Sequence, residues 1–333
     1  MRARPLRELT ARWWAGELGA AGTALAALTL PAERAYGAAI AARNRRYDRG
    51  EGVTRVAAPV LSVGNLGVGG AGKTPVAAWL VRELQARGRR PTLLHGGYAA
   101  DEPALHRAWA PDVPVIAQRD RVAAARTALA GGADVLVLDD GFQHRRLARD
   151  LDLVLVAAEH WTPRPRLLPR GPWREGPDAL RRATLVAVTR RTAPPERAAA
   201  VVAELGRWTR APVLQLHLRA TGWEQGGMPS EAPAGWSLAV AGIADPEAFA
   251  ENARAAGAQV HALLPFPDHH RYGAADARRI LAAAVQGRIV TTAKDWIKLQ
   301  RLLPAAQVWV LRQDVAVESG DGALAAALAR LLA

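Results

Sequence analysis

Residues 62–75 read Ser62-Val63-Gly64-Asn65-Leu66-Gly67-Val68-Gly69-Gly70-Ala71-Gly72-Lys73-Thr74-Pro75, and this stretch decides the fold. Between Gly67 and Thr74 it matches the pattern G-x-x-x-x-G-K-[ST], which is typical of loops that bind phosphate groups. The short apolar run at 59–63 predicts a buried strand, and the apolar spacing over 76–84 predicts a helix. The loop therefore has the strand–loop–helix context that phosphate binding requires.

The residue types in this loop suit a nucleotide and a metal ion. Glycines allow the loop to curl so that backbone N–H groups face an anion, and the helix N-terminus adds a partial positive charge. We expect Lys73 to reach the β- and γ-phosphates of ATP and the Thr74 hydroxyl to bind Mg²⁺. Pro75 lies in the first helical turn, where a missing N–H costs nothing. The predicted nucleotide-binding residues are Gly67, Val68, Gly69, Gly70, Ala71, Gly72, Lys73, Thr74 and Pro75.

The composition is that of a globular protein with a strong positive charge. A length of 333 residues suggests about two domains. The 44 Lys and Arg residues outnumber the 31 Asp and Glu residues, and the resulting net charge of +13 favours an anionic partner. Such a partner is a membrane surface, a nucleic acid or a phosphorylated substrate. The chain has no cysteine, which excludes disulfides and thiolate metal sites.

Residues 1–50 differ from the rest of the chain. Arginines flank Trp13-Trp14 and a run of 15 uncharged residues, 18–32. This run is shorter than the roughly 20 apolar residues of a membrane-spanning helix. A secretory signal is disfavoured, because Glu17 interrupts the apolar region and export would place the phosphate loop where nucleotide is scarce. Two interpretations stay open: helices lying in the headgroup region of an anionic membrane surface, or ordinary amphipathic helices packed on the protein.

Downstream of the phosphate loop, strand-like runs alternate with helical patterns. This order predicts an α/β fold like that of P-loop NTPases, with a doubly wound, mostly parallel sheet. The stretch 213–235, which contains glycines and prolines, is expected to be an extended linker. We therefore predict a membrane-associating helical segment at 1–50, a P-loop core at 51–212, the linker at 213–235 and a smaller α/β domain at 236–333.

A buried strand predicted at 134–138 is followed by two carboxylates, Asp139 and Asp140. In doubly wound sheets the ligand crevice lies at the carboxyl ends of the strands, which places these side chains beside the phosphate loop. A carboxylate is needed there to organise Mg²⁺, directly or through water. Thr74, Asp139 and Asp140 are therefore the candidate metal residues.

Motifs spaced along nearly the whole chain carry a family resemblance. They are Val63-Gly64-Asn65-Leu66, Asp101-Glu102-Pro103, Asp139-Asp140-Gly141-Phe142-Gln143-His144, Leu168-Pro169-Arg170-Gly171-Pro172-Trp173-Arg174-Glu175, Ala241-Gly242-Ile243, Phe266-Pro267-Asp268-His269-His270 and Thr292-Ala293-Lys294-Asp295. Their order and spacing resemble those of the tetraacyldisaccharide 4′-kinases. The resemblance implies ATP- and Mg²⁺-dependent phosphorylation of the 4′-hydroxyl of a tetraacylated disaccharide 1-phosphate. It also implies action at the cytoplasmic face of the bacterial inner membrane, and it favours the interfacial interpretation of residues 1–50.

The resemblance assigns catalytic roles as well. It implies that Asp101 is the carboxylate at the acceptor hydroxyl and that His269, next to Asp268, pairs with it from the second domain. A carboxylate whose basicity is tuned by an imidazole suits phosphoryl transfer to an alcohol, which needs orientation and late proton removal. Without the resemblance, the residues favour a helix N-cap at Asp101 and a solvated turn at 268–270. The candidate catalytic residues are Lys73, Asp101, Asp268 and His269.

The candidate substrate-binding residues follow from the same motifs and from nearby cations. They are Glu102, Arg121, Gln143, His144, Arg170 and Arg174. The arginines would neutralise phosphate charge, although free arginines are usually just solvated.

Two positions depart from the family pattern. The sequence His95-Gly96-Gly97-Tyr98-Ala99 stands where the family usually has Ser-Arg-Gly-Tyr-Gly. Arg170 stands where the family commonly has a small residue. We hypothesise that Arg170 replaces the missing cation.

Three other functions are weaker. One alternative is a different P-loop phosphotransferase or a GTPase. A GTPase usually needs the guanine-reading motif Asn-Lys-x-Asp, which Ala293-Lys294-Asp295 does not supply. A nucleic-acid partner is not expected, because aromatic residues are only 5% of the chain and the tryptophans are scattered. A zinc site at His269-His270 is disfavoured, because adjacent histidines point in different directions. The sequence gives no indication of the oligomeric state.

Overall fold

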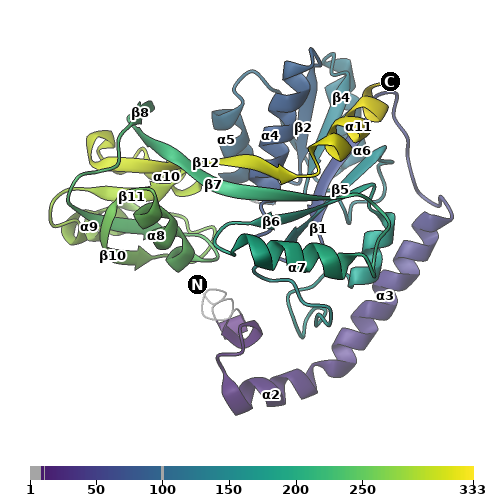
Figure 1. Ribbon diagram of the computed structural model, residues 1–333, viewed down its shortest axis with the longest axis horizontal. Helices are drawn as coiled ribbons and strands as arrows, with labels where there is room; N and C mark the ends of the chain where they lie inside the picture. Colours follow the sequence, from purple (N-terminus) through teal and green to yellow (C-terminus); the bar gives the residue numbers. More distant parts are fainter. Residues whose placement is uncertain (1–8, 11, 99–100) are drawn as a thin grey trace.

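The computed structural model describes residues 9–10, 12–98 and 101–333, and one mixed sheet runs through both halves of the chain (Figure 1). The 12 strands follow the spatial order β10-β9-β11-β12-β7-β6-β5-β1-β4-β2-β3, with β8 paired to β7. Their bounds are β1 Val60–Asn65, β2 Pro91–His95, β3 Val115–Ala117, β4 Val135–Asp139, β5 Leu151–Ala157, β6 Leu185–Arg190, β7 Val213–Gln225, β8 Met228–Ser230, β9 Trp236–Ala241, β10 Gln259–Pro265, β11 Ile289–Thr292 and β12 Val308–Ser319.

Helices lie between most of these strands. The α-helices are α2 Gly19–Leu28, α3 Leu30–Asp48, α4 Lys73–Ala86, α5 Asp101–Trp109, α6 Arg121–Ala130, α7 Pro195–Leu205, α8 Pro246–Ala255, α9 Ala274–Ala283, α10 Ala293–Leu299 and α11 Asp321–Leu332. Two short 3-10 helices, Pro177–Arg182 and Ala305–Gln307, complete the described elements.

The central strands alternate their side chains between two cores, as a sheet covered on both faces requires. In β4, Val135 and Val137 pack in the core under α4 and α11, whereas Leu136 and Leu138 face the core under α6. β1 pairs in parallel with β4 and with β5. The predicted doubly wound, mostly parallel α/β sheet is confirmed.

β7 and β12 form a long antiparallel ribbon that joins the two halves of the molecule (Figure 1). Most of the predicted linker, 213–235, lies in β7 of this ribbon. At its start β7 also pairs with β6. The linker is extended, as predicted, but it is hydrogen-bonded into the sheet. β12 begins with an apolar run and continues to Ser319, because pairing with β7 supports the strand where that run has ended. We call residues 226–307, between the two ribbon strands, the small lobe, and the rest from residue 51 the core lobe.

The chain ends by returning to the core lobe. Leu324 and Leu328 of α11 share a hydrophobic core with Leu214 and Leu216 of β7. The last helix therefore belongs with the core lobe, which differs from the predicted contiguous domain at 236–333.

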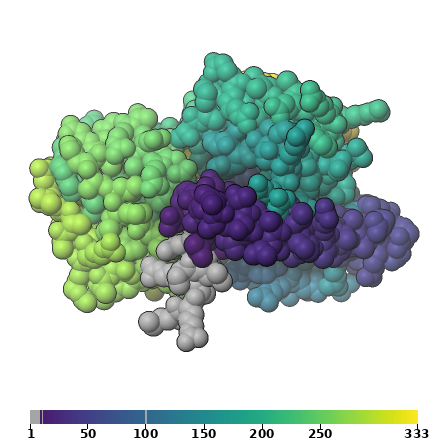
Figure 2. Space-filling view, turned by 90° about the horizontal axis from the view of Figure 1, so that it is seen from below, coloured from purple at the N-terminus to yellow at the C-terminus, as the bar shows by residue number. Residues whose placement is uncertain are grey.

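The helices α2 and α3 lie outside both lobes. Figure 2 shows them as a continuous stretch that runs from the junction of the lobes outward along the core lobe. None of the side chains of α3 is buried, and the helix is attached by polar contacts such as that from the Tyr36 hydroxyl to the Arg174 carbonyl oxygen (3.1 Å). Of the helices that the structure describes, none combines the length and the apolar character needed to cross a membrane.

Candidate active site

The phosphate loop connects β1 to α4, and its shape depends on a glycine in the left-handed region. Gly72 has φ +83°, and a Cβ there would lie 2.3 Å from Cδ1 of Leu218, so the turn into α4 requires glycine. Asn65 at the end of β1 donates from Nδ2 to the Gly69 carbonyl oxygen (3.1 Å). The same amide accepts a hydrogen bond from Nζ of Lys73 (3.2 Å). Lys73 therefore lies over the concave side of the loop, where a phosphate chain would bind.

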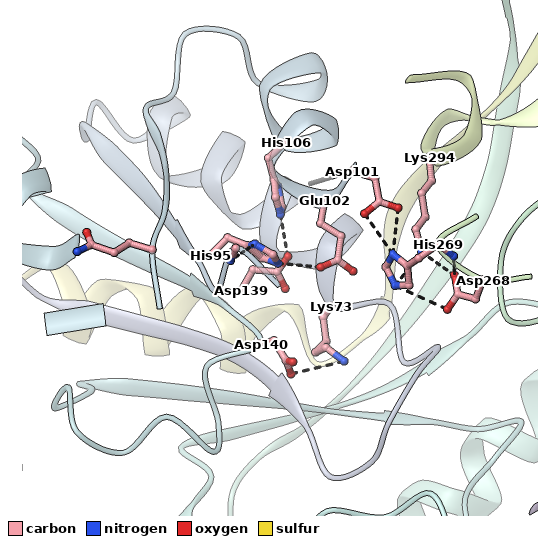
Figure 3. A network of polar contacts seen from close by, with 12 residues as sticks. Lys73, His95, Asp101, Glu102, His106, Asp139, Asp140, Asp268, His269 and Lys294 are labelled. Carbon is pink, nitrogen blue, oxygen red and sulfur yellow. Dashed lines mark hydrogen bonds and ion pairs between the residues drawn. The ribbon is translucent and has the colours of Figure 1, made fainter. Parts of the chain in front are cut away.

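Two carboxylates at the end of β4 lie beside the loop in different surroundings (Figure 3). Asp139 is 1% exposed, and its Oδ2 lies 2.8 Å from Nε2 of His106. Asp140 lies 3.6 Å from Nζ of Lys73, and Nη1 of Arg174 donates to both of its oxygens at 2.9 and 3.1 Å.

The electrostatics favour the charged form of both carboxylates. Burial opposes ionisation of each. The hydrogen bond from His106 nevertheless holds the pKa of Asp139 below its ordinary value. The charges of Lys73 and Arg174 hold the pKa of Asp140 below its ordinary value in the same way. The site therefore contains two negatively charged carboxylates that can interact with cations.

The second part of the site is a carboxylate–imidazole pair between the lobes. Asp101 is the first residue of α5 and is 8% exposed. His269, in the loop after β10, has φ +57°, and its Nδ1 lies 3.1 and 3.0 Å from the two carboxylate oxygens of Asp101 (Figure 3). The hydrogen bond with Asp101 raises the pKa of His269 against the effect of burial. The predicted pairing is therefore present, across 168 residues of sequence.

Two lysines of α10 extend this pair. Nζ of Lys294 lies 2.8 Å from Oδ1 of Asp268 and 3.4 Å from Nε2 of His269. Nζ of Lys298 lies 3.5 Å from Oδ2 of Asp101. Burial opposes ionisation of Asp101, but His269 and the two lysines together hold its pKa well below the usual range. Asp101 is thus an anion held by cations of the small lobe.

A single large cleft between the lobes collects these groups. It has a volume of about 2540 Å³ and is lined by the phosphate loop, Asp139, Asp140, Asp268 and His269. The six predicted substrate-binding residues line it too. Asp101 alone among the predicted site residues is not on the cleft wall, which agrees with its low exposure.

Two of the predicted substrate-binding residues have partners on neighbouring elements. Oε2 of Glu102 lies 2.7 Å from Nε2 of His95, a buried residue at the end of β2. Nη1 of Arg170 lies 3.0 Å from Oε2 of Glu33 in α3. The cation hypothesised to replace the missing family arginine is therefore shared with the amino-terminal helices.

Three others are held by the core lobe. Gln143 donates from Nε2 to the Asn65 carbonyl oxygen at 2.9 Å. Burial, with nearby arginines, lowers the pKa of His144 to about 4, so this imidazole is neutral at neutral pH. Arg121 is 2% exposed, and Nη1 donates to the Gln118 carbonyl oxygen at 2.7 Å, while Nε has no hydrogen-bond partner among the described residues. Burial lowers the pKa of Arg121.

Sequence reasoning missed His106, Lys298 and the supporting role of Asn65. Asp101, for which the residues alone favoured a helix N-cap, is the first residue of the helix α5. Glu102 and His106 are four residues apart and therefore share one face of that helix. Helical spacing over 101–109 was the signal that would have placed His106 near the site.

The residues beside the loop fit a magnesium ion. The described residues contain no cluster of three or more His, Asp or Glu side chains placed to hold a metal by themselves. Mg²⁺ is usually held by one or two carboxylates together with substrate phosphates, so a complete protein cage is not needed. The charged carboxylates of Asp139 and Asp140, next to the loop that carries Thr74, are the donor set that this mode requires.

Comparison with known proteins gives consistent matches over the whole fold. A family model described as tetraacyldisaccharide-1-P 4′-kinase matches residues 25–333. A protein of Anaeromyxobacter dehalogenans (strain 2CP-C) named tetraacyldisaccharide 4′-kinase is 42% identical, over 96% of this chain and 94% of its own length. A protein of the same name from Syntrophus aciditrophicus (strain SB) is 38% identical, over 79% of this chain and 82% of its own.

A solved structure shares the fold. It is that of LpxK from Aquifex aeolicus, described as being in complex with ATP. Its sequence is 28% identical to this chain, and it superposes with a TM-score of 0.76. The match covers 93% of this chain and 100% of that one, so it extends over both lobes.

Proposed function

This chain belongs to the tetraacyldisaccharide-1-P 4′-kinase family, and from that premise we propose how the residues of the cleft divide the reaction among them. The enzyme uses ATP to phosphorylate the 4′-hydroxyl of tetraacyldisaccharide 1-phosphate, a step of lipid A biosynthesis. In such transfers the protein contributes mainly positioning and electrostatic stabilisation. The side chains of the cleft therefore act by placing the donor, the acceptor and the compensating charge.

On the donor side, the backbone amides of Gly67–Gly72 and the ammonium of Lys73 bind the β- and γ-phosphates. Lys73 is 15% exposed and lies within reach of Asn65 and Asp140, which support its place over the loop. Arg174 is held against Asp140 and adds a second positive charge to the same wall. These cations offset the negative charge of the phosphate chain and of the transferring group.

Thr74 and Asp139, with Asp140 as the alternative carboxylate, would hold Mg²⁺ on the donor side. Such an ion would supply positive charge that offsets the negative charge of the transferring phosphate. Neighbouring cations and hydrogen bonds keep both carboxylates charged, beside a loop whose motif ends in a threonine.

On the acceptor side, Asp101 and His269 act as a pair at the 4′-hydroxyl. Asp101 accepts the hydroxyl hydrogen bond and orients the oxygen toward the γ-phosphorus, and the pair takes up the proton late in the transfer. His269 lies on the cleft wall while Asp101 is almost covered, so the acceptor reaches Asp101 when the small lobe shifts. Asp268 and Lys294 hold His269 from its other side. Glu102, Arg121, Gln143, His144, Arg170 and Arg174 line the remaining space for the phosphorylated sugar.

One observation carries this assignment: Asp101 of the core lobe and His269 of the small lobe are in hydrogen-bond contact at the cleft that also holds the phosphate loop. The test compares Asp101→Ala, His269→Ala and the double variant, with turnover and ATP affinity measured on each. We expect each single variant to lose about 10²- to 10⁴-fold in turnover with ATP affinity kept. The double variant should lose little more than the worse single one, because the residues act as a unit. Near-normal turnover in Asp101→Ala would remove that residue from the mechanism.

We also place the enzyme at the cytoplasmic face of the bacterial inner membrane, with α2 and α3 in contact with an anionic leaflet. Leu25 and Leu28 of α2 are 37% and 77% exposed, and arginines follow along α3. Apolar side chains beside arginines suit insertion at the headgroup boundary.

Vesicle binding tests this placement with a matched control. Leu25→Asp combined with Leu28→Asp should weaken co-sedimentation with vesicles that contain anionic lipid. Leu281→Asp combined with Val285→Asp places the same two charges on the small lobe, at side chains that are 38% and 80% exposed, and it should leave co-sedimentation unchanged. Equal binding by all three proteins would defeat the placement.

A further inference from the structure

Two buried histidines connect helix α5 to the carboxyl edge of the sheet. One lies at the end of a strand and contacts the helix, and the other lies in the helix and contacts the end of a strand. His95, at the end of β2, contacts Glu102 of the helix at 2.7 Å. His106, in the helix, contacts Asp139 at the end of β4 at 2.8 Å. Both histidines are buried (Figure 3). The Glu102 side chain is 29% exposed, whereas that of Asp139 is 2% exposed, so the contact of His106 with Asp139 is the one shielded from water.

The hydrogen-bond pattern decides the tautomer of each ring. The Gly97 N–H donates to Nδ1 of His95 at 3.0 Å, so Nδ1 is unprotonated and Nε2 donates to Glu102. Nδ1 of His106 is buried with no hydrogen-bond partner among the described residues. A charged carboxylate can only accept a hydrogen bond, so Nε2, which faces Oδ2 of Asp139, carries a proton. His106 is therefore a donor to Oδ2 of Asp139.

We propose that His106 is a positioning residue that orients the Asp139 carboxylate for the donor-side magnesium ion. The contact uses Oδ2 and restricts the rotation of the carboxylate, and Asp139 lines the cleft that also contains the phosphate loop. The inference rests on the assignment of Asp139 to Mg²⁺ made under the proposed function. Hydrogen bonds from a second layer of residues orient metal-binding carboxylates in this way and influence metal affinity strongly.

The same contact links the two halves of the reaction. Asp101 opens α5, and His106 lies five residues later in the same short helix. A helix is rigid over this distance, so the position of the acceptor carboxylate is tied to that of Asp139. The orientation of the Asp139 carboxylate therefore depends on the position of Asp101.

Three variants separate orientation from packing. His106→Leu keeps an apolar side chain in the site and removes the donor. His106→Gln restores an N–H close to the position of Nε2. His95→Leu removes the other histidine anchor of α5, whose hydrogen bonds go to Glu102 and Gly97 and not to Asp139. Asp139→Asn is made in parallel to report on the metal assignment itself.

The readout is nucleotide binding by the full-length chain, without acceptor and therefore without turnover. The affinity of a fluorescent ATP analogue is measured over a series of Mg²⁺ concentrations, and thermal melting is recorded for every variant. In His106→Leu the Mg²⁺ concentration for half-maximal enhancement of binding should rise about tenfold. His106→Gln should return it close to the wild-type value, and His95→Leu should leave it unchanged although it melts earlier. Affinity without Mg²⁺ should be the same in all of them.

The outcomes distinguish the two levels of the claim. A raised Mg²⁺ requirement in Asp139→Asn but not in His106→Leu overturns the role of His106 alone. An unchanged requirement in Asp139→Asn removes the metal assignment, and the inference with it. If His106→Gln is as impaired as His106→Leu, or His95→Leu is impaired equally, the contact serves packing only and the inference is wrong. Should His106→Leu fail to fold, His106→Asn takes its place, because its shorter side chain does not reach Oδ2.

Discussion

Replacing Asp101 by asparagine removes the charge that faces His269 while keeping the shape of the side chain, and we expect the pKa of His269 to fall. In the wild-type chain the hydrogen bond with Asp101 raises this pKa, against the opposing effects of burial and of Lys294. An asparagine oxygen still accepts a hydrogen bond from Nδ1, so the local geometry is kept. The change therefore isolates the charge of the carboxylate.

The size of the shift follows from the contact. Nδ1 of His269 lies 3.0 Å from the nearer oxygen of Asp101, whose side chain is only 7% exposed. A hydrogen bond to a charged group contributes about 1.5 to 3 kcal/mol, and one pKa unit corresponds to about 1.4 kcal/mol. The His269 side chain is 35% exposed, so solvent screens part of the interaction. We therefore expect the lower end of that range, a fall of about one pKa unit.

Proton NMR titration of the full-length chain measures this shift, with the His269 resonance assigned from a His269→Gln variant. Asp268→Asn is the control, because Oδ2 of Asp268 lies 3.8 Å from Nε2 of His269 and its side chain is 39% exposed. Its effect should be clearly smaller. An unchanged pKa in Asp101→Asn, or equal shifts in the two variants, would refute the reasoning.

The same pair fixes the direction of a pH effect on stability. His269 has a raised pKa, so its contribution is complete below the unfolded value and is lost as pH rises through the folded value. Asp101 has a lowered pKa, so its contribution is present above the unfolded value and is lost as pH falls. The difference in unfolding free energy between wild type and Asp101→Asn should therefore be largest near pH 5 to 6, roughly between the two unfolded pKa values. Urea unfolding at a series of pH values measures it.

The remaining predictions concern the donor site and its rim. Gly72→Ala should lower the free energy of unfolding by about 1–3 kcal/mol of backbone strain, and further because its Cβ would lie 2.3 Å from a leucine of β7. Gly88→Ala, with φ +72° and open space around it, should lose the strain contribution alone. Urea unfolding compares the two variants, and equal losses of unfolding free energy would contradict the clash. Lys73→Ala should lower ATP turnover at least about a hundredfold with little change in melting temperature, and retained turnover would argue against its role. Arg170→Ala should raise the KM for the lipid acceptor and leave kcat nearly unchanged; a normal KM would dismiss the idea that this arginine, now paired with Glu33, replaces a missing cation.

The parts of the site that the sequence predicts are those that depend on residues close together in the sequence. The loop from Gly67 to Thr74 and the carboxylates after β4 are encoded by short runs whose strand or helix character is local. The sheet order places their carboxyl ends together, so a site beside the loop could be expected. The pairing of Asp101 with His269 had no such local signal, because 168 residues separate them. It came from family resemblance.

The elements that were missed depend on tertiary contacts. α5 has only nine residues and begins Asp-Glu-Pro, a sequence that also suits a turn. Beyond its apolar start, β12 carries Arg312, Gln313 and Asp314. This part is a strand because β7 pairs with it. The contact between His106 and Asp139 exists only once α5 is placed on the sheet. Helical spacing over 101–109 favours α5, but local patterns do not determine the length of β12 or the contact between His106 and Asp139.

The most direct measurement of the central claim is phosphoryl transfer to a chemically defined acceptor. Purified protein, ATP and Mg²⁺ are mixed with detergent-dispersed tetraacyldisaccharide 1-phosphate, and ADP release is followed together with the mass and linkage of the lipid product. We expect ADP release in step with the addition of one phosphate at the 4′ position, and no release when that position is already phosphorylated. ADP release that is the same with the blocked lipid, or a product phosphorylated elsewhere, would contradict the assignment of this chain as a 4′-kinase.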